Sequence, residues 1–376
     1  MTTKFLLMFS LFIAAQFITK AQSALSLAGD WQIKLDPTNT GEKENWATKQ
    51  FNEKIKLPGT TDEAGYGEKN IAVNEGFLSR PYKYVGAVWY SREINIPKDW
   101  QVKSINLLLE RVIWQSKIFL DGKLMGVKDA LSVPHLHPLG QLTAGRHWLS
   151  IRIDNDLIYN IGDKGHMYTD HMQTIWNGIV GKIELVAHEK NHITSIKTFP
   201  DIDKKVLGLA LDFSKSAPAK NTTLSYKIIN VKSNKIILKK TEQVTILNDE
   251  YFTSLNIKDS IILWDEFNPA MYRLEIEFLN GKTIEKSTTN FGFRKVSHSA
   301  SKILINNLPV FIRGNLDCLN FPLTGYPSCA ISYWKNIFKV YQQHGLNYVH
   351  FHSGCPPEAA FVAADEMGLY LSLIHI

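Results

Sequence analysis

Short β-strand patterns recur along most of this chain, and they are the strongest constraint on its fold. Between Leu25 and Val296, apolar and β-branched runs such as WQIKL, SKIFLDG and HWLSIRID alternate with segments of Gly, Pro, Asn and Asp. No long 3.6-residue periodicity appears among them. Many short strands at this spacing are typical of antiparallel sandwiches and jelly rolls. The chain up to Val296 is therefore predicted to be all-β.

Two β-domains fit this part of the chain. The strand-like runs of residues 25–188 suit one jelly-roll sandwich. Those of residues 189–296 suit a smaller immunoglobulin-like sandwich, because about 100 residues with some seven strands is the usual size of that fold. The Cys–Trp–Cys pattern of antibody domains is absent, so only the architecture is predicted.

The pattern changes at residue 297. Two short strands are expected around an Asn306–Asn307 turn, and Asp317 follows the first barrel strand by three residues. The remaining elements are expected to be a helix at Ser332–Gly345, a strand at Tyr348–His352, a helix at Pro356–Gly368 and a strand at Leu369–Leu373. Alternating strands and helices imply parallel pairing. A (β/α)₈ barrel needs about 250 residues, so residues 297–376 are predicted to be the truncated opening of a TIM barrel.

The N-terminus has the layout of a cleavable secretory signal. Lys4 precedes the apolar run FLLMFSLFIAAQF, and small residues follow at Ala21, Ser23 and Ala24. The run is short for a membrane span, which needs roughly 20 apolar residues. Residues 1–24 are therefore predicted to be a signal peptide, and the mature protein is expected to be secreted or periplasmic, with no membrane attachment.

Charge and cysteine content exclude several classes of protein. The formal net charge is +6, and the lysines are scattered rather than gathered in a block, so no nucleic-acid partner is expected. The three cysteines, Cys318, Cys329 and Cys355, include no CxxC pair and favour buried free thiols, although one bridge among them stays open. No cofactor motif is present: there is no Gly-rich phosphate loop and no complete metal-ligand set.

Several segments together resemble glycoside hydrolase family 2, the family of β-galactosidases, β-glucuronidases and β-mannosidases. They are LAGDWQIKLDP (Leu27–Pro37), IKLPGT (Ile55–Thr60), YVGAVWYSREINIP (Tyr84–Pro97), IFLDGKLMGV (Ile118–Val127), IWNGIVGKIEL (Ile175–Leu185), FGFRKV (Phe291–Val296) and LINNLPVFIRG (Leu304–Gly314). The resemblance covers nearly the whole mature chain in the family's order: sugar-binding jelly roll, immunoglobulin-like sandwich, catalytic barrel.

The resemblance implies an exported retaining exo-β-glycosidase that acts on oligo- or polysaccharides. Such enzymes use two Glu residues about 5 Å apart, and in this family both lie on barrel strands later than the third. No catalytic residue is therefore expected within this chain. Glu358, Asp365 and Glu366 are interpreted as helix-cap or solvated carboxylates. A divalent cation and a homo-oligomer are both compatible with the full-length enzyme.

Four residues near the ends of the first two barrel strands are predicted to bind substrate: Asp317, His350, His352 and Ser353. Asp317 is equally consistent with a turn-capping role. His350 stands where the family usually has an Arg that supports the nucleophile, and Gly354 stands where relatives often carry Trp. His352 and Ser353 fit the family pattern, with a satisfied core histidine as the alternative for His352. His350 and His352 alone supply only two ligands, which is weak evidence for a metal site, so no metal site is predicted.

Loop residues and tryptophans of the jelly roll add weaker expectations. The loop His166–Trp176 is expected by analogy with the family to reach the barrel mouth. Trp89, Trp114, Trp148 and Trp176 could stack on sugars, but the sandwich core is favoured for most of them.

The end of the chain leaves two alternatives open. Relatives carry a carboxylate at the position of Ile374, and the match disappears from Ser372 onward, so the chain is expected to be the N-terminal part of a longer enzyme. If the stop after Ile376 is genuine, the product would be a non-catalytic carbohydrate-binding protein or the product of a degenerate gene.

Overall fold

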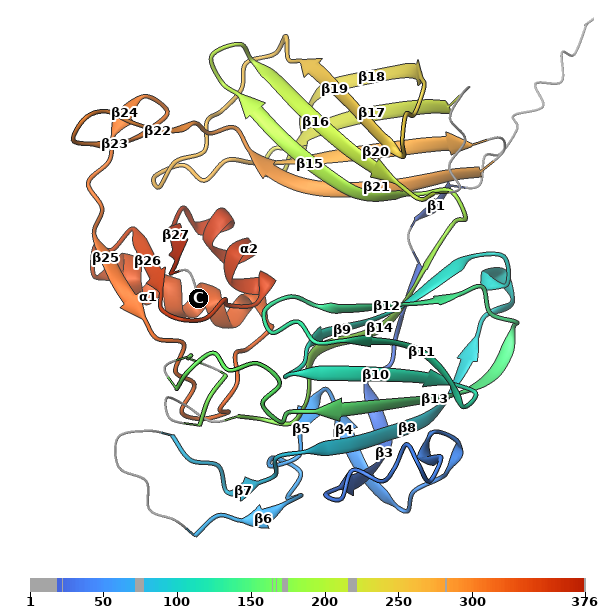
Figure 1. Ribbon diagram of the computed structural model, residues 1–376. Coiled ribbons are helices and arrows are strands. Elements are labelled where there is room, and N and C mark those ends of the chain that lie inside the picture. The colour runs from blue at the N-terminus through green and yellow to red at the C-terminus, as the bar shows by residue number, and fades with distance from the viewer. Residues whose placement is uncertain are drawn as a thin grey trace, which may run out of the picture.

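The computed structural model describes residues 19–21, 23–71, 78–163, 165–166, 168–170, 175–215, 222–280 and 283–374. Residues 1–18 and 22 of the predicted signal peptide lie outside them. The described chain is mostly β-sheet with two α-helices. Figure 1 separates it into a first β-sandwich, a second β-sandwich and a smaller parallel unit.

The first sandwich has two facing sheets. One sheet runs β11 (Lys123–Lys128), β10 (Gln115–Leu120), β13 (Gly145–Asp154), β8 (Ala87–Ile96), β3 (Gly29–Asp36), β4 (Glu53–Leu57). The other runs β12 (His135–Gly140), β9 (Ser104–Arg111), β14 (Gly178–His188), β2 (Ser23–Ser26), with β5 (Gly59–Thr60) beside β14. β6 (Glu68–Lys69) pairs with β7 (Tyr82–Lys83), and η1 (Trp46–Thr48) and η2 (Lys98–Trp100) are short 3₁₀ helices.

Alternating strand residues supply the core of this sandwich. Trp31 and Tyr90 from one sheet and Leu107 and Leu185 from the other are buried in one cluster, because successive side chains of a strand point to opposite faces. Trp31 therefore packs between the two sheets. The turn at Asp121–Gly122 joins β10 to β11, and both residues have positive φ (50° and 80°), as a two-residue hairpin requires.

The second sandwich has its own core. Its larger sheet runs β1 (Thr19–Ala21), β21 (Thr283–Gly292), β20 (Met271–Asn280), β17 (Thr222–Asn230), β18 (Ile236–Val244). Its smaller sheet runs β15 (Ile193–Asp201), β16 (Val206–Phe213), β19 (Glu250–Asn256). Leu209 and Leu211 from one sheet and Leu274 and Ile276 from the other are buried together. The exact domain boundaries stay predictions.

The third unit has parallel strands, as expected. The hairpin sheet β22 (Val296–His298), β23 (Ile303–Ile305), β24 (Leu308–Pro309) precedes a parallel sheet β25 (Gly314–Asp317), β26 (Tyr348–Phe351), β27 (Tyr370–Leu373). The helices are α1 (Ile331–Gln343) and α2 (Glu358–Met367). Neither of these two helices of the described chain is long and apolar enough to cross a membrane.

One sequence-based position in this unit is wrong. Asp317 is the last residue of β25 rather than the third residue after the strand. The apolar segment before Gly314 favours a first barrel strand that ends three residues before Asp317. That segment instead forms the hairpin strands and an irregular stretch, because Asn306 and Asn307 (φ 52° and 68°) turn the chain back there.

A mostly aromatic and apolar core joins the first sandwich to the parallel unit. Its members include Ile113, Trp114 and Trp176 on one side and Trp334, Phe338 and Phe351 on the other. Trp89, Trp114 and Trp176 are almost fully buried, so burial is confirmed for these three, but their expected place in the sandwich core is wrong. Trp114 and Trp176 lie in this joining core, and Trp89 lies in a small separate cluster with Trp46 and Phe119. The loops that carry Ile113, Trp114 and Trp176 are thereby fixed against the parallel sheet.

The three cysteines are free thiols, as favoured, but they are half-buried rather than buried. Burial raises the pKa of Cys329, and Glu110 beside it adds to the effect, so that the pKa reaches about 12. Cys329 is therefore a neutral thiol at physiological pH, and its role is packing rather than thiolate chemistry.

We predict that Trp334→Ala destabilises the parallel unit by about 3–5 kcal/mol, the usual cost of removing a buried tryptophan. Trp334 is fully buried against Phe321, Phe338 and Phe351, and its Nε1 donates to the Ser328 carbonyl at 2.7 Å. Hydrogen-exchange mass spectrometry should find faster exchange in β26.

The same measurement should find β17 of the second sandwich unchanged, because that strand belongs to a separate core. Phe252→Ala, at an exposed aromatic position, is the matched control and should change neither strand. Equal loss of protection in β17 and β26 would contradict the prediction that the cores unfold separately.

Candidate functional site

Most of the predicted site residues lie at the carboxyl ends of the parallel strands. β26 ends at Phe351 and is followed by His352 and Ser353, and Ser372 lies near the end of β27. The carboxyl ends of parallel strands meet at one edge of a sheet, where ligands of α/β proteins bind. We call His166, His350, His352, Ser353 and Ser372 the rim.

The two faces of β26 are chemically different. Val349 and Phe351 are fully buried in the core shared with the helices. Tyr348 and His350 alternate with them and therefore lie on the opposite face. The polar face of β26 is thus the face away from the helix layer, as expected of a strand that presents side chains to a ligand.

His350 is held by two hydroxyl groups. Its Nδ1 is hydrogen-bonded to Ser372 Oγ, which is also hydrogen-bonded to the Tyr348 hydroxyl. The Tyr348 hydroxyl lies 3.4 Å from the same His350 nitrogen. Among the described residues, no hydrogen bond reaches Nε2 of His350. That nitrogen is therefore available to a ligand, in a ring whose orientation Ser372 and Tyr348 fix.

Sequence reasoning missed Tyr348 and Ser372. Tyr348 could have been found from its i, i+2 spacing to His350. Ser372 could not, because its role depends on the parallel register that places it opposite His350. A Cβ at Gly314 would lie 2.3 Å from the Tyr348 ring, so glycine at this position gives Tyr348 its space.

Asp317 lies on the other face of the sheet. Its register partner is Phe351, which points toward the helices. One carboxylate oxygen accepts a hydrogen bond from the Leu319 N–H at 2.7 Å, and the other accepts from the Tyr341 hydroxyl at 3.1 Å. Both oxygens thus have partners within the chain, as the turn-capping interpretation expects. Substrate binding by Asp317 stays an untested prediction.

His352 meets a histidine of the first sandwich. Nδ1 of His352 lies 2.9 Å from Nδ1 of His166 and 2.9 Å from Ser353 Oγ. Nδ1 of His166 also lies 2.9 Å from the His352 carbonyl oxygen, and the two rings meet edge to face with centroids 4.7 Å apart. The loop that begins at His166 therefore reaches the edge of the parallel sheet, as predicted. His171 of that loop lies outside the described residues.

These contacts assign donor and acceptor roles to the two rings. A nitrogen that faces both a carbonyl oxygen and a ring nitrogen must be a donor, so His166 carries its proton on Nδ1. Nδ1 of His352 then accepts, which leaves its proton on Nε2. Burial lowers the pKa of His166, the hydrogen bond to the His352 carbonyl opposes this, and the neighbouring His352 ring lowers it again. The contact therefore disfavours a positive charge on His166.

Two buried arginines tie the first sandwich to the loops of the parallel unit. Arg111 Nη2 donates to the Cys355 carbonyl at 2.7 Å, two residues after Ser353. Arg80, paired with the buried Asp62, donates to the Gly325 carbonyl at 3.0 Å. No sequence pattern indicates either arginine, because both contacts span more than 240 residues.

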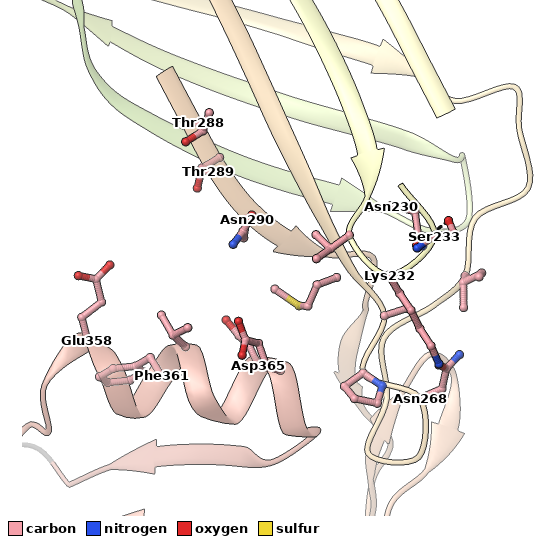
Figure 2. A pocket seen from close by; sticks show the side chains of 17 residues that line it. Asn230, Lys232, Ser233, Asn268, Thr288, Thr289, Asn290, Glu358, Phe361 and Asp365 are labelled. Atoms are coloured by element: carbon pink, nitrogen blue, oxygen red, sulfur yellow. Dashed lines mark hydrogen bonds between the residues drawn. The ribbon is translucent and has the colours of Figure 1, made fainter. Parts of the chain in front are cut away.

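Carboxylates do not gather at the rim. Glu358, Asp365 and Glu366 lie on α2, where they border a different cavity, of about 1020 Å³, between α2 and the second sandwich (Figure 2). Within the described ranges, no group of three or more His, Cys, Asp or Glu side chains could hold a metal ion. The rim as described can position a polar ligand by hydrogen bonds, and it contains no acid pair for hydrolysis.

Comparison with known proteins identifies the relatives. Residues 191–294 match the model of Glycosyl hydrolases family 2. A β-glucuronidase of Streptococcus agalactiae is 22% identical over 316 residues, which are 79% of this chain and 48% of that protein. A β-galactosidase of Oenococcus oeni is 22% identical over 317 residues, which are 78% of this chain and 30% of that protein.

A solved structure supports the same relationship at the level of fold. The β-glucuronidase of Ruminococcus gnavus, in complex with a C6-substituted uronic isofagomine, superposes with a TM-score of 0.73 at 16% identity. The match covers 94% of this chain and 59% of that one. The chain therefore spans about half or less of the curated relatives' length. These matches confirm the resemblance to glycoside hydrolase family 2.

We predict that acid weakens the fold through His166. The unfolded chain protonates this ring near its ordinary pKa of about 6.5, whereas the folded chain does so only at lower pH. Below about pH 6.5 the unfolded state therefore binds more protons, and the free energy of unfolding falls as the pH falls. Urea unfolding midpoints, measured from about pH 8 to about pH 5, should fall less steeply for His166→Gln than for the wild type.

Gln keeps an N–H donor for the His352 carbonyl but does not titrate in this range. His298→Gln, at an exposed position, is the control and should keep the wild-type slope. If His166→Gln also keeps that slope, the His166–His352 contact does not contribute to the pH dependence.

Proposed function

We propose that this chain, a relative of the family 2 glycoside hydrolases, is the N-terminal portion of an exported retaining exo-β-glycosidase. It would remove terminal sugars from oligo- or polysaccharides. The observation that carries the proposal is the rim: a polar strand face with His350, His352 and Ser353 near its carboxyl end, closed on one side by His166 of the first sandwich.

The parallel unit supports a barrel as the catalytic domain. Three parallel strands with two helices packed on one face are the repeating elements of a (β/α)₈ barrel, and barrel enzymes place their sites at the carboxyl ends of the strands. The relatives extend well beyond the length that this chain covers. In the proposed enzyme the two catalytic Glu residues come from later strands, and no residue described here is catalytic.

The rim residues would bind the sugar in this enzyme. His350 and His352 would each present an Nε2 nitrogen to a sugar hydroxyl group, which suits such a ring because a hydroxyl both donates and accepts. By the family resemblance, His350 stands at a position that usually holds Arg. The imidazole held by Ser372 would take the place of a planar guanidinium at this point.

The decisive experiment is to read the gene downstream of the Ile376 codon and to assay its full-length product on 4-nitrophenyl β-galactoside, β-glucuronide and β-mannoside. We expect an open reading frame with further βα units and two Glu residues, and release of nitrophenol from one glycoside. Proton NMR of the first product should detect the β-anomer, as retention requires.

A stop directly after Ile376 would contradict hydrolysis by this product. The alternatives would then be a non-catalytic carbohydrate-binding protein or the product of a degenerate gene. An α-anomer as first product would contradict retention but not glycoside hydrolysis.

We predict that His352→Ala lowers kcat/KM on the cleaved glycoside by roughly 10–100-fold, the loss expected for one or two hydrogen bonds to a sugar. His344→Ala, at an exposed histidine at the end of α1, should change kcat/KM less than about twofold. Equal activity of His352→Ala and His344→Ala would exclude His352 from substrate binding.

A further inference from the structure

Strand β12 buries two histidines inside the first sandwich. Its sequence is HLHPLG, and His135 and His137 are 1% and 0% exposed, whereas Leu136 between them is 47% exposed. Because successive side chains of a strand point to opposite faces, a shift of one residue would bury Leu136 and expose both rings. The histidines therefore occupy the core face against the hydrophobic pattern, and such conflicts are typical of functional or strained sites.

A serine of the facing sheet joins the two rings. Ser116 of β10 is fully buried, and its Oγ lies 2.7 Å from Nδ1 of His135 and 2.8 Å from Nε2 of His137. Nε2 of His135 lies 2.8 Å from the Ala130 carbonyl oxygen. We call Ser116, His135 and His137 the clasp, and residues 129–134, which connect β11 to β12, the clasp segment.

The hydrogen bonds of the clasp have one direction. Burial lowers the pKa of His135 and lowers that of His137 to about 3, so each ring carries a single proton at pH 7. The proton of His135 lies on Nε2, because a carbonyl oxygen only accepts. Ser116 therefore donates to Nδ1 of His135 and accepts from Nε2 of His137. Nδ1 of His137 has no proton and no hydrogen-bond partner among the described residues.

The strands beside the clasp are apolar. In the register of β9 and β12, Leu109 lies opposite His135 and Leu107 lies opposite His137. Gly126 of β11 lies beside Nδ1 of His137, and a Cβ there would be 3.6 Å from that nitrogen. A second proton on His137 would therefore create a buried charge and a donor without an acceptor, which is costly.

Two charged residues act on the rings from the start of the clasp segment. Lys128 lowers the pKa of both His135 and His137, and Asp129 raises that of His135. Asp129 already accepts a hydrogen bond from the Tyr159 hydroxyl at 2.7 Å. The opposing charges leave burial as the main influence on both rings, and the closed clasp resists protonation.

The clasp segment leads from the clasp to the rim. His135 holds its Ala130 carbonyl, and Leu131 packs against the core that joins the first sandwich to the parallel unit. Ser132 Oγ lies 2.9 Å from the hydroxyl of Tyr168, which is buried in that core. Tyr168 is two residues from His166 of the rim. Continuous contacts thus connect the clasp to the backbone that carries this rim histidine.

We propose that the clasp is an acid-sensitive switch that controls the order of the rim. At neutral pH the closed clasp fixes the clasp segment and, through Ser132 and Tyr168, the backbone that carries His166. In acid the rings bind protons when the clasp opens, so β12 and the clasp segment lose their anchor. The consequence for sugar binding rests on the proposed function, whereas the opening of the clasp does not.

Hydrogen-exchange mass spectrometry of the gene's full-length product tests the switch. The rate of each peptide is divided by its intrinsic rate at the same pH, which gives a protection factor. An opened ring binds a proton below its ordinary pKa of about 6.5, and this favours the open state about tenfold per pH unit. Between about pH 6.5 and about pH 4.5, the protection of β12 should therefore fall about a hundredfold.

Two other segments report on the reach of the switch. The Tyr168 N–H donates to the Gly165 carbonyl at 3.2 Å, and it should lose protection together with β12. Strand β17 belongs to the separate core of the second sandwich and should keep its protection.

Two variants and a control assign the effect to the clasp. His137→Gln keeps an N–H donor for Ser116 but does not titrate, so it should remove at least about tenfold of the fall in β12. Gly126→Ser adds a hydroxyl beside Nδ1 of His137 that can accept from the protonated ring, and it should also make the fall smaller. His298→Gln, at an exposed position, should keep the wild-type fall.

Three results would overturn the proposal. One is protection of β12 that stays constant between about pH 6.5 and about pH 4.5. Another is a fall that is equal in the wild type, His137→Gln and Gly126→Ser. The third is a fall in β12 with no change at Tyr168, which would break the link to the rim. None of these measurements depends on cleavage of nitrophenyl glycosides, so the switch and the proposed hydrolysis can fail independently.

Discussion

The rest of this structure depends on the aromatic and apolar core that joins the first sandwich to the parallel sheet. Trp114 and Trp176 leave the sandwich and pack in the same cluster as Trp334 and Phe351. Burying such large side chains stabilises the joint by several kcal/mol in total. Because loops are otherwise mobile, this packing allows residues distant in the sequence to form one rim with a fixed geometry.

The polar contacts at the rim depend on that core. His166 and His352 lie 2.9 Å apart through their Nδ1 atoms, and a displacement of either backbone by an ångström would break the bond. Arg111 and Arg80 reinforce the same joint with hydrogen bonds to the Cys355 and Gly325 carbonyls. The apolar core supplies the energy of docking, and the buried arginines fix its register, since each must find a partner once desolvated.

Much of the fold could be predicted because local patterns determined it. The Asp121–Gly122 hairpin, the helix ending before Gly345 and the strand at Tyr348–Phe351 follow from turn chemistry, capping and alternation. Asp317 shows the limit. Placing the strand a few residues too early moved this side chain from the helix face to the ligand edge, because strand periodicity is two and any odd error reverses the face.

The contacts that define the candidate site were less predictable, because they arise from tertiary register. Ser372 meets His350 only because β26 and β27 pair in parallel with those two residues opposite each other. His166 reaches His352 across 186 positions, and only the family analogy suggested that its loop would approach the barrel. A single sequence does not show which residues far apart along the chain will come into contact.

The two sides of helix α2 differ in composition. Its small alanines allow it to lie close on the parallel sheet, which keeps the carboxyl end of β26 open as the rim. Its opposite side carries the carboxylates that sequence reasoning set aside as solvated. Glu366 pairs with Lys335 of α1, and Asp365 lies 4.0 Å from Arg294 of the second sandwich, so two of the three carboxylates have partners within the chain. These two carboxylates therefore help to hold α2 against α1 and the second sandwich rather than serving only to solvate the helix.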